Sequence, residues 1–417
     1  MSSSSNSLLL NRKQEPPTKN QESLNFHEEI LSVQHQIQKE QHASSSPMMM
    51  IEEIPSEIWL DHIFTFLEGK ILLNTCMFVS KQWKEYVKKT TCSLLNLSIR
   101  ADTSTKRDLI FSNLYLEHVE SLDLSFNGLS KRGIVHWAKF GHKFTELTGL
   151  NLKFNMLRDS AIIVLAQLEC LKKLKHLNLA SNKIDTEGFE AIVKSPYFSN
   201  ITTLQLQENQ IGLEDLSIQP SQVTLSQLTY LDLNQNCITT HGMQFLSTCP
   251  AFQNLTYLNL SKNSLNEHAL KYLANGVFTK LETLDLNGCS ILDSGIIQLA
   301  SGNIHHLTCL NLARNGIGDS AVSALVSSTR VSHLQKLILS HNRITNVGSS
   351  SIASCPHLKK LKHLSLIRNS IDEKGQKALL DRFPDMIHLQ LPQLSSKQSE
   401  FETFFNAMDK ISNRYNY

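Results

Sequence analysis

The residues that could perform chemistry in this sequence are few. The closest approach to a cluster is His305-His306 with Cys309, whose side chains can all bind zinc. A structural zinc site needs a fourth ligand, and none is evident, so the sequence predicts neither a metal site nor a cofactor. The chain also contains no HExxH, no glycine-rich phosphate loop and no Gly-x-Ser-x-Gly. We therefore expect a protein that is not an enzyme.

A second group of side chains is suited to binding rather than to catalysis. Two tyrosines, Tyr230 and Tyr257, stand 27 residues apart, and tyrosine is enriched in the hot spots of protein interfaces. Basic side chains follow, and arginine pairs with carboxylate or phosphate groups in bidentate fashion. Whether these groups share one surface depends on the elements that carry them. The candidate binding residues are Tyr230, Asp232, Tyr257, Arg314, Lys336, His341 and Arg368.

Composition limits the class of protein. The chain has 417 residues, and its 40 basic and 38 acidic residues give a formal charge of +2, so nothing pulls it toward nucleic acid or membrane. No apolar run approaches the ~18 residues that a membrane-spanning helix needs. Eight cysteines without a CxxC pair indicate reduced thiols. We expect a cytoplasmic or nuclear protein, or one found in both places.

A phrase of the form L-x-x-L-x-L-x-x-N-x-I/L recurs along most of the sequence, for example as LKHLNLASNKI and LTYLDLNQNCI. Its asparagines follow one another at intervals of 26 to 28 residues, and Cys289 fills the one gap. A period in the twenties with this phrase is the signature of the leucine-rich repeat. The asparagine column, as we call this series, comprises Asn127, Asn155, Asn182, Asn209, Asn236, Asn263, Asn315, Asn342 and Asn369.

Each repeat unit is expected to be a strand followed by a helix. The L-x-L alternation predicts a short strand with leucines facing the core, and the asparagine can satisfy backbone groups in the turn after it. Four residues later stand types that begin helices, such as Asp159 and Asp319, and two further on a small residue lets the helix lie close to the strand layer. The predicted fold class is α/β, a leucine-rich-repeat solenoid (horseshoe) with ribonuclease-inhibitor-like repeats of about 27 residues.

The sequence divides into four predicted segments. Residues 1–48 are rich in Ser, Gln, Asn, Glu and Lys, which predicts a disordered polar tail. Residues 49–91 predict a small helical module, and residues 92–391 predict an array of about twelve units. Residues 392–417 predict a capping helix and tail, because apolar residues recur there at helical spacing: Phe401, Phe404, Phe405 and Met408.

One unit departs from the pattern. After Asn209 the small column holds Asp215, and Pro220 stands where a helix should continue. Because proline removes a helical hydrogen bond and clashes with the preceding turn, we expect this segment to be irregular. Loss of a helix in a tolerant unit is the simpler interpretation, and a partner-binding loop is the alternative.

Residues 54–83 carry a different pattern, directly ahead of the repeats. They contain Ile54-Pro55-Ser56-Glu57-Ile58, Ile63-Phe64-Thr65-Phe66-Leu67, Leu72-Leu73 and Val79-Ser80-Lys81-Gln82-Trp83. This order resembles the F-box, which begins Leu-Pro-x-Glu-Ile and ends Val-Ser-Lys-x-Trp. Two departures are that Ile54 replaces Leu and that the gap from Leu73 to Val79 looks one residue too long. The repeats in turn resemble the cysteine-containing type common behind F-boxes, through Cys249-Pro250, Cys355-Pro356 and Cys289.

F-box/leucine-rich-repeat proteins, as a family, are the substrate receptors of SCF-type ubiquitin ligases. The resemblance implies that the F-box docks on a Skp-family adaptor and so reaches a cullin scaffold, while the repeats hold a protein target. It also implies which residues bind the adaptor or hold the F-box together: Pro55, Ile58, Ile63, Phe64, Leu67, Leu72 and Val79.

Other functions stay open at this point. The helical module could be only a cap, which would leave an interaction scaffold without a link to ubiquitin. Ribonuclease-inhibitor-like arrays also occur in GTPase activators, where Arg314 or Arg368 would complete a partner's active site. We place the candidate binding residues on the concave face, where the basic group suits an acidic or phosphorylated target segment.

Overall fold

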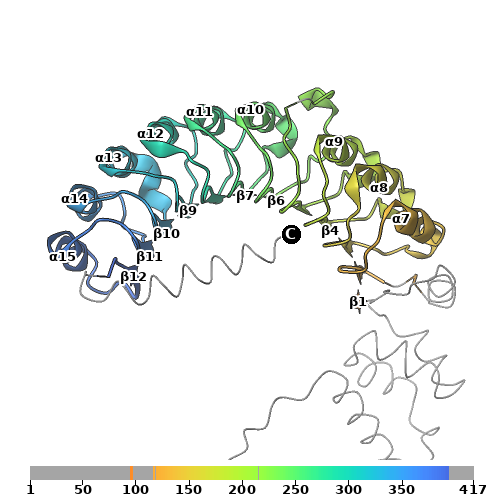
Figure 1. The fold of residues 1–417 in the computed structure, drawn as a ribbon, viewed down its shortest axis with the longest axis horizontal. Helices are drawn as coiled ribbons and strands as arrows, with labels where there is room; N and C mark the ends of the chain where they lie inside the picture. Colours follow the sequence, from red (N-terminus) through yellow and green to blue (C-terminus); the bar gives the residue numbers. More distant parts are fainter. Residues whose placement is uncertain (1–93, 97–115, 118, 215, 394–417) are drawn as a thin grey trace, which may run out of the picture. The chain divides into compact units, whose positions relative to one another are not determined.

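Figure 1 shows the protein as a computed structural model that describes residues 94–96, 116–117, 119–214 and 216–393. The chain divides into two compact units, Met1–Ile63 and Phe64–Tyr417, and every described residue belongs to the second. The predicted polar tail, F-box and capping helix lie outside the described residues, as do all seven predicted adaptor-binding residues. These assignments stay predictions.

Twelve short parallel strands form one sheet in the described part of the chain, and their order in the sheet follows the sequence. Each strand has three residues and pairs in register with the strands beside it, so that equivalent residues of successive units stand side by side. The strands are β1 (Leu94–Asn96), β2 (Ser121–Asp123), β3 (Gly149–Asn151), β4 (His176–Asn178), β5 (Thr203–Gln205), β6 (Tyr230–Asp232), β7 (Tyr257–Asn259), β8 (Thr283–Asp285), β9 (Cys309–Asn311), β10 (Lys336–Ile338), β11 (His363–Ser365) and β12 (His388–Gln390).

The α-helices alternate with the strands and lie on the outer side of the arc that the repeats form in Figure 1. They are α7 (Lys131–Ala138), α8 (Arg158–Leu165), α9 (Thr186–Lys194), α10 (Thr240–Thr248), α11 (Glu267–Asn275), α12 (Leu292–Ser301), α13 (Asp319–Ser327), α14 (Asn346–Ser354) and α15 (Glu373–Arg382). Short 3-10 helices lead into several strands: η5 (Gly141–Lys143), η6 (Glu169–Leu171), η7 (Pro196–Phe198), η8 (Pro220–Gln222), η9 (Pro250–Phe252) and η10 (Thr329–His333). This arrangement confirms the predicted leucine-rich-repeat solenoid.

The core runs as one continuous layer between the strands and the helices. In the unit of β4, the three leucines of the repeated phrase are all buried: Leu174, Leu177 and Leu179. Phe189 and Ile192 of α9 belong to the same core and pack from the helix side. No unit could bury this surface alone, because its leucines also contact the units before and after it. The alternation of leucines in the sequence therefore predicts the core correctly.

The asparagine column joins successive units. The Asn182 Oδ1 accepts hydrogen bonds from the backbone N–H groups of Asn155 at 2.9 Å and Leu157 at 3.4 Å, both in the preceding unit. Its Nδ2 donates to the carbonyls of Leu152 at 2.9 Å and of Leu179 at 3.0 Å. The side chain thus holds two units together, which goes beyond the predicted role within a single turn.

Cysteine and serine make a second connection between units, at the C-terminal ends of the helices. Ser195 Oγ donates to the Ala166 carbonyl at 2.6 Å, and Cys355 Sγ donates to the Val326 carbonyl at 3.1 Å. Cys289 stands in the asparagine column, where its Sγ donates to the Leu260 carbonyl at 3.1 Å. Burial raises the pKa of this thiol to about 12, which keeps it a donor. Cys289 and Cys355 therefore serve as hydrogen-bond donors between units.

Two details of the predicted unit are wrong. The predicted helix-start residues do not cap their own helices: Asp159 Oδ1 accepts from the backbone N–H groups of Asp185 at 2.8 Å and Gly188 at 3.0 Å, both in the next unit. The N-cap of α9 is Asp185, one position earlier in the repeat. The small column makes room for this carboxylate as well as for the core, because a Cβ on Gly188 would collide with both Asp159 Oδ1 and Ile184 Cγ2.

The unit that contains Pro220 lacks an α-helix among its described residues, as predicted. Between β5 and β6 only η8 interrupts an irregular path. Glu190 of α9 accepts hydrogen bonds from the backbone N–H and the hydroxyl of Ser217, and Thr224 N donates to the Val193 carbonyl at 2.8 Å. The preceding helix therefore fixes the path of this segment.

Candidate protein-binding surface

Three columns of side chains line the inner face of the sheet. Because strand residues point alternately to opposite faces, the first and third residues of each strand face away from the core. We call these the first inner column, which includes Tyr230 and Tyr257, and the second inner column, which includes Asp232 and Asp285. The turn column is the residue directly before the asparagine column, as at Arg314.

The predicted tyrosine pair is the strongest feature of the first inner column. Tyr230 and Tyr257 stand in register on β6 and β7, with ring centroids 4.0 Å apart and ring planes 6° from parallel. Both side chains are half-buried. The pKa of Tyr257 is raised by burial, then by its hydrogen bond with Tyr230, then by the carboxylates of Asp232 and Asp285. The phenol of Tyr257 is therefore neutral at physiological pH.

The carboxylates beside this pair are held by the backbone. Asp232 Oδ1 accepts from Asn234 N at 2.9 Å, and its Oδ2 accepts from the Asn259 amide at 3.3 Å. Only 7% of Asp232 is exposed, and burial raises the pKa of its carboxyl group, with Asp285 and Glu208 adding to the effect. The predicted binding residue Asp232 is thus largely a structural one, whereas Asp285 is only half-buried.

The second inner column has a structural task that sequence reasoning missed. Its side chain accepts a hydrogen bond from the backbone N–H two residues later, as Asp123 does from Ser125 at 2.8 Å and Asn151 from Lys153 at 3.1 Å. Aspartate and asparagine commonly fold back in this way at turns. The near-uniform Asp/Asn composition of the column was the available signal.

The turn column has a left-handed backbone throughout. Its φ values lie between 52° and 67° in Phe126, Phe154, Ser181, Glu208, Gln235, Lys262, Gly288, Arg314, His341 and Arg368. This region is rare for residues other than glycine and costs about 1–2 kcal/mol each. The next unit holds the conformation in place, as where Arg314 N donates to the Ser340 carbonyl at 3.0 Å.

The predicted basic residues occupy two columns at one end of the array. Lys336 lies in the first inner column on β10, whereas Arg314, His341 and Arg368 occupy the turn column of three successive units. The basic end of the array is also separate from the tyrosine pair, because β7 and β10 are three strand spacings apart, about 14 Å. The candidate residues therefore define two regions of the inner face, one aromatic and acidic, the other basic.

An exposed aromatic pair at the other end of the described array was not predicted. Phe126 and Phe154 of the turn column stack with ring centroids 5.0 Å apart, although 49% and 53% of these residues is exposed. Bulky side chains in a left-handed conformation are outliers. Their 28-residue spacing in the sequence was the available signal.

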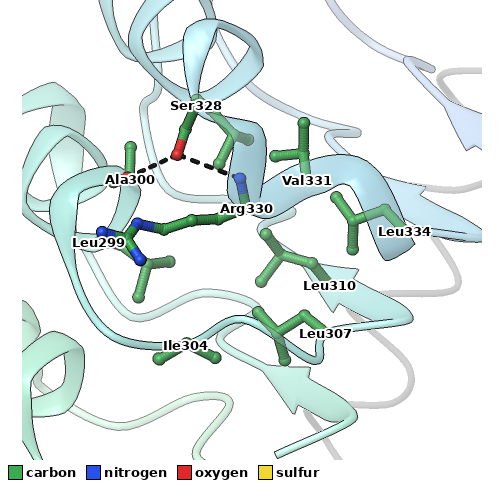
Figure 2. Close-up of a pocket in the computed structure, with 10 residues that line it drawn as sticks. Leu299, Ala300, Ile304, Leu307, Leu310, Ser328, Arg330, Val331 and Leu334 are labelled. Atoms are coloured by element: carbon green, nitrogen blue, oxygen red, sulfur yellow. Dashed lines mark hydrogen bonds between the residues drawn. The ribbon is translucent and has the colours of Figure 1, made fainter. Parts of the chain in front are cut away.

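In the described part of the chain, the structure adds no further metal ligand to His305, His306 and Cys309. His305 and His306 are exposed, and Arg330 Nη1 lies 2.9 Å from His305 Nδ1. Among the described residues, no three His, Cys, Asp or Glu side chains are grouped as metal ligands. The Arg330 side chain instead crosses a small apolar cavity of about 20 Å³ between units (Figure 2), which holds no more than one water.

Comparison with known proteins shows the repeats directly. A sequence profile of the leucine-rich repeat matches residues 115–135, 170–193, 225–247, 279–300, 303–326 and 332–353. No curated protein matches the chain. No helix in the described ranges is both long enough and apolar enough to cross a membrane. The chain is thus shown to contain leucine-rich repeats over much of its length.

Several solved structures are similar to this chain. The TLR13–ssRNA13 complex is 22% identical over 75% of this chain, which spans only 41% of that chain, with a TM-score of 0.50. The yeast Rad7–Elc1 complex is 15% identical over 93% of this chain and 97% of that one, with a TM-score of 0.46. An internalin from Listeria monocytogenes is 18% identical over 71% and 96%, with a TM-score of 0.41. Likenesses at this level speak to the fold alone.

Proposed function

We propose that this chain is the substrate-recognition subunit of an SCF-type ubiquitin ligase. The observation that supports the proposal is the F-box-like pattern of residues 54–83, placed directly ahead of a leucine-rich-repeat array. In this proposal the F-box binds a Skp-family adaptor and, through it, a cullin scaffold. The inner face of the repeats binds the protein target.

The chain itself makes and breaks no bond in this proposal. It raises the effective concentration of the target's lysines near the ubiquitin-transferring enzyme, because both are bound to one scaffold. Its partners are proteins rather than nucleic acid or membrane. The described cysteines are free thiols, which suits the reducing cytoplasm or nucleus.

Co-purification with a Skp-family adaptor tests the proposal. The double variant Ile63→Asp, Leu72→Asp should lose the adaptor, because a carboxylate buried in an apolar interface without a partner is too costly. The matched control is Val347→Asp, which makes the same kind of change on an exposed helix residue of the array and should leave adaptor binding intact. Circular dichroism must show that the repeats of the double variant remain folded.

Two outcomes would count against the proposal. If the unaltered chain recovers no adaptor, the helical module is a cap and the protein is an interaction scaffold without a link to ubiquitin. If the folded double variant keeps the adaptor, binding does not use the F-box pattern.

A further inference from the structure

We propose that the middle of the inner face binds a cationic side chain of the target, arginine above all, against the Tyr230–Tyr257 pair and the carboxylates of Asp232 and Asp285. This inference rests on the proposed function in one respect only: it requires that the inner face binds a protein segment. It does not depend on the F-box.

The first support is the accessibility of the ring faces. The two phenols cover one another on one side, at a centroid distance of 4.0 Å. Their in-register neighbours on the outer sides are Thr203 on β5 and Thr283 on β8. A threonine side chain is too short to cover a phenol ring, so a flat group can lie against either outer face. The negative face of an aromatic ring attracts a cation placed over it.

The second support is the sign of the charge around the pair. Across β5 to β8 the three inward columns carry three carboxylates, Glu208, Asp232 and Asp285, against one ammonium, Lys262. The Lys262 Nζ lies in the turn column and donates to Gln235 Oε1 at 3.2 Å. Asp232 and Asp285 lie close enough to the phenols to raise the pKa of Tyr257, and Asp285 and Glu208 raise that of Asp232. A bound cation would relieve this mutual repulsion.

The third support is that Asp285 retains hydrogen-bonding capacity. Asp285 Oδ1 accepts from Asn287 N at 2.9 Å, and its Oδ2 accepts from the Asn311 amide at 2.9 Å. A carboxylate has about four acceptor positions, so two stay available on this half-buried group. A guanidinium group can stack on a ring and pair with a carboxylate at the same time, which an ammonium group cannot do. Arginine therefore fits the site better than lysine.

Synthetic peptides provide a direct test. The probes are two libraries of twelve-residue peptides with randomised flanks, one with a central arginine and one with a central citrulline, which keeps the planar shape but has no charge. Binding to the purified full chain is measured by fluorescence anisotropy. We expect the arginine library to bind about tenfold more tightly, since a cation–π contact and a charged hydrogen bond are both lost with citrulline.

The array supplies its own isosteric variants. Asp232→Asn, Asp285→Asn should remove the preference for arginine while keeping the turns, because asparagine already fills this column at Asn151, Asn178, Asn259 and Asn311. Tyr230→Leu, Tyr257→Leu should also remove it, whereas Tyr230→Phe, Tyr257→Phe should keep it. The matched control is Asp123→Asn, which lies in the same column, makes the same turn bond to Ser125 and has Ser121 and Gly149 rather than tyrosines beside it in the first inner column.

Three results would overturn the inference: equal binding of the two libraries, a preference for arginine that survives both aspartate substitutions, or tighter binding of a library with central glutamate. The outcome is separate from that of the proposed function. A chain that prefers arginine but recovers no adaptor refutes only the ubiquitin-ligase role, and a chain that recovers the adaptor but shows no preference refutes only this site.

Discussion

We expect the substitution Asn182→Ala to lower the free energy of unfolding of the array more than the substitution Asn178→Ala does. Asn182 is fully buried between two units, and its side chain accepts from two backbone N–H groups and donates to backbone carbonyls. The carbonyls of Leu152 and Leu179 keep a partner in the variant, because Asn155 Nδ2 donates to the first at 2.9 Å and Asn209 Nδ2 to the second at 3.1 Å. The loss therefore falls on the two N–H groups.

The magnitude follows from those two donors. The N–H groups of Asn155 and Leu157 are in the interior and donate to the Asn182 Oδ1, at 2.9 and 3.4 Å. A buried donor left without a partner costs about 1–3 kcal/mol, and the longer bond lies at the low end. We expect the free energy of unfolding to fall by about 2–4 kcal/mol.

Urea unfolding of the full chain, followed by circular dichroism, measures the effect. The matched control is Asn178→Ala, four residues earlier, where the half-exposed side chain accepts a single bond from Ala180 N at 3.0 Å. This control should cost about 1 kcal/mol or less. A loss in Asn182→Ala no larger than in Asn178→Ala would refute the reasoning that the column joins units through buried N–H groups.

Three further variants test other parts of the structure. Cys289→Asn should stabilise the array by about 1 kcal/mol in the same urea assay, because asparagine restores a strong acceptor where the sulfur is a weak one; a lower midpoint would show that the amide does not fit. Asp232→Asn should raise the melting temperature at neutral pH, because the raised pKa means that the charged carboxylate destabilises the fold. The gain should shrink as the pH falls through the raised pKa and disappear below the ordinary value of 3.8, where the carboxyl is protonated in both states. A gain that is constant with pH would contradict this assignment. The double variant Arg314→Glu, Arg368→Glu should weaken target capture without changing adaptor recovery if the basic end of the array binds acidic or phosphorylated groups. Unchanged capture would show that these groups of the target bind elsewhere, for example at the segment around Pro220.

The sequence predicts the features of this fold that repeat within a unit, and it fails for those that pass between units. The leucines, the strand positions and the loss of a helix at Pro220 depend on local pattern, and all are found as expected. Asp159 was assigned to its own helix because capping rules are local, yet it holds the helix of the next unit. The sequence of a single unit does not show which residues of the neighbouring units its side chains contact.

The candidate site shows the same division. The Tyr230–Tyr257 contact was predictable, because two residues at the same position of adjacent units must stand in register. The left-handed backbone of the turn column was not, because carbonyl groups of the next unit hold it, as the Ser340 carbonyl does at Arg314. The predicted adaptor-binding residues lie outside the described residues, so the structure leaves that part of the site as a prediction.

The inner face divides into columns that hold the fold and a column that is open to variation. The second inner column is mostly aspartate or asparagine because its side chain closes the turn, and the asparagine column is fixed by its bonds between units. The first inner column carries no such bond in common, and its residues range from Gly149 through Tyr230 to Lys336. A protein can change a position of this kind at little cost in stability, since surface substitutions away from such contacts usually shift it by less than about 0.5 kcal/mol. The specificity of this surface for its target should therefore reside first in this column, where the tyrosine pair and Lys336 stand.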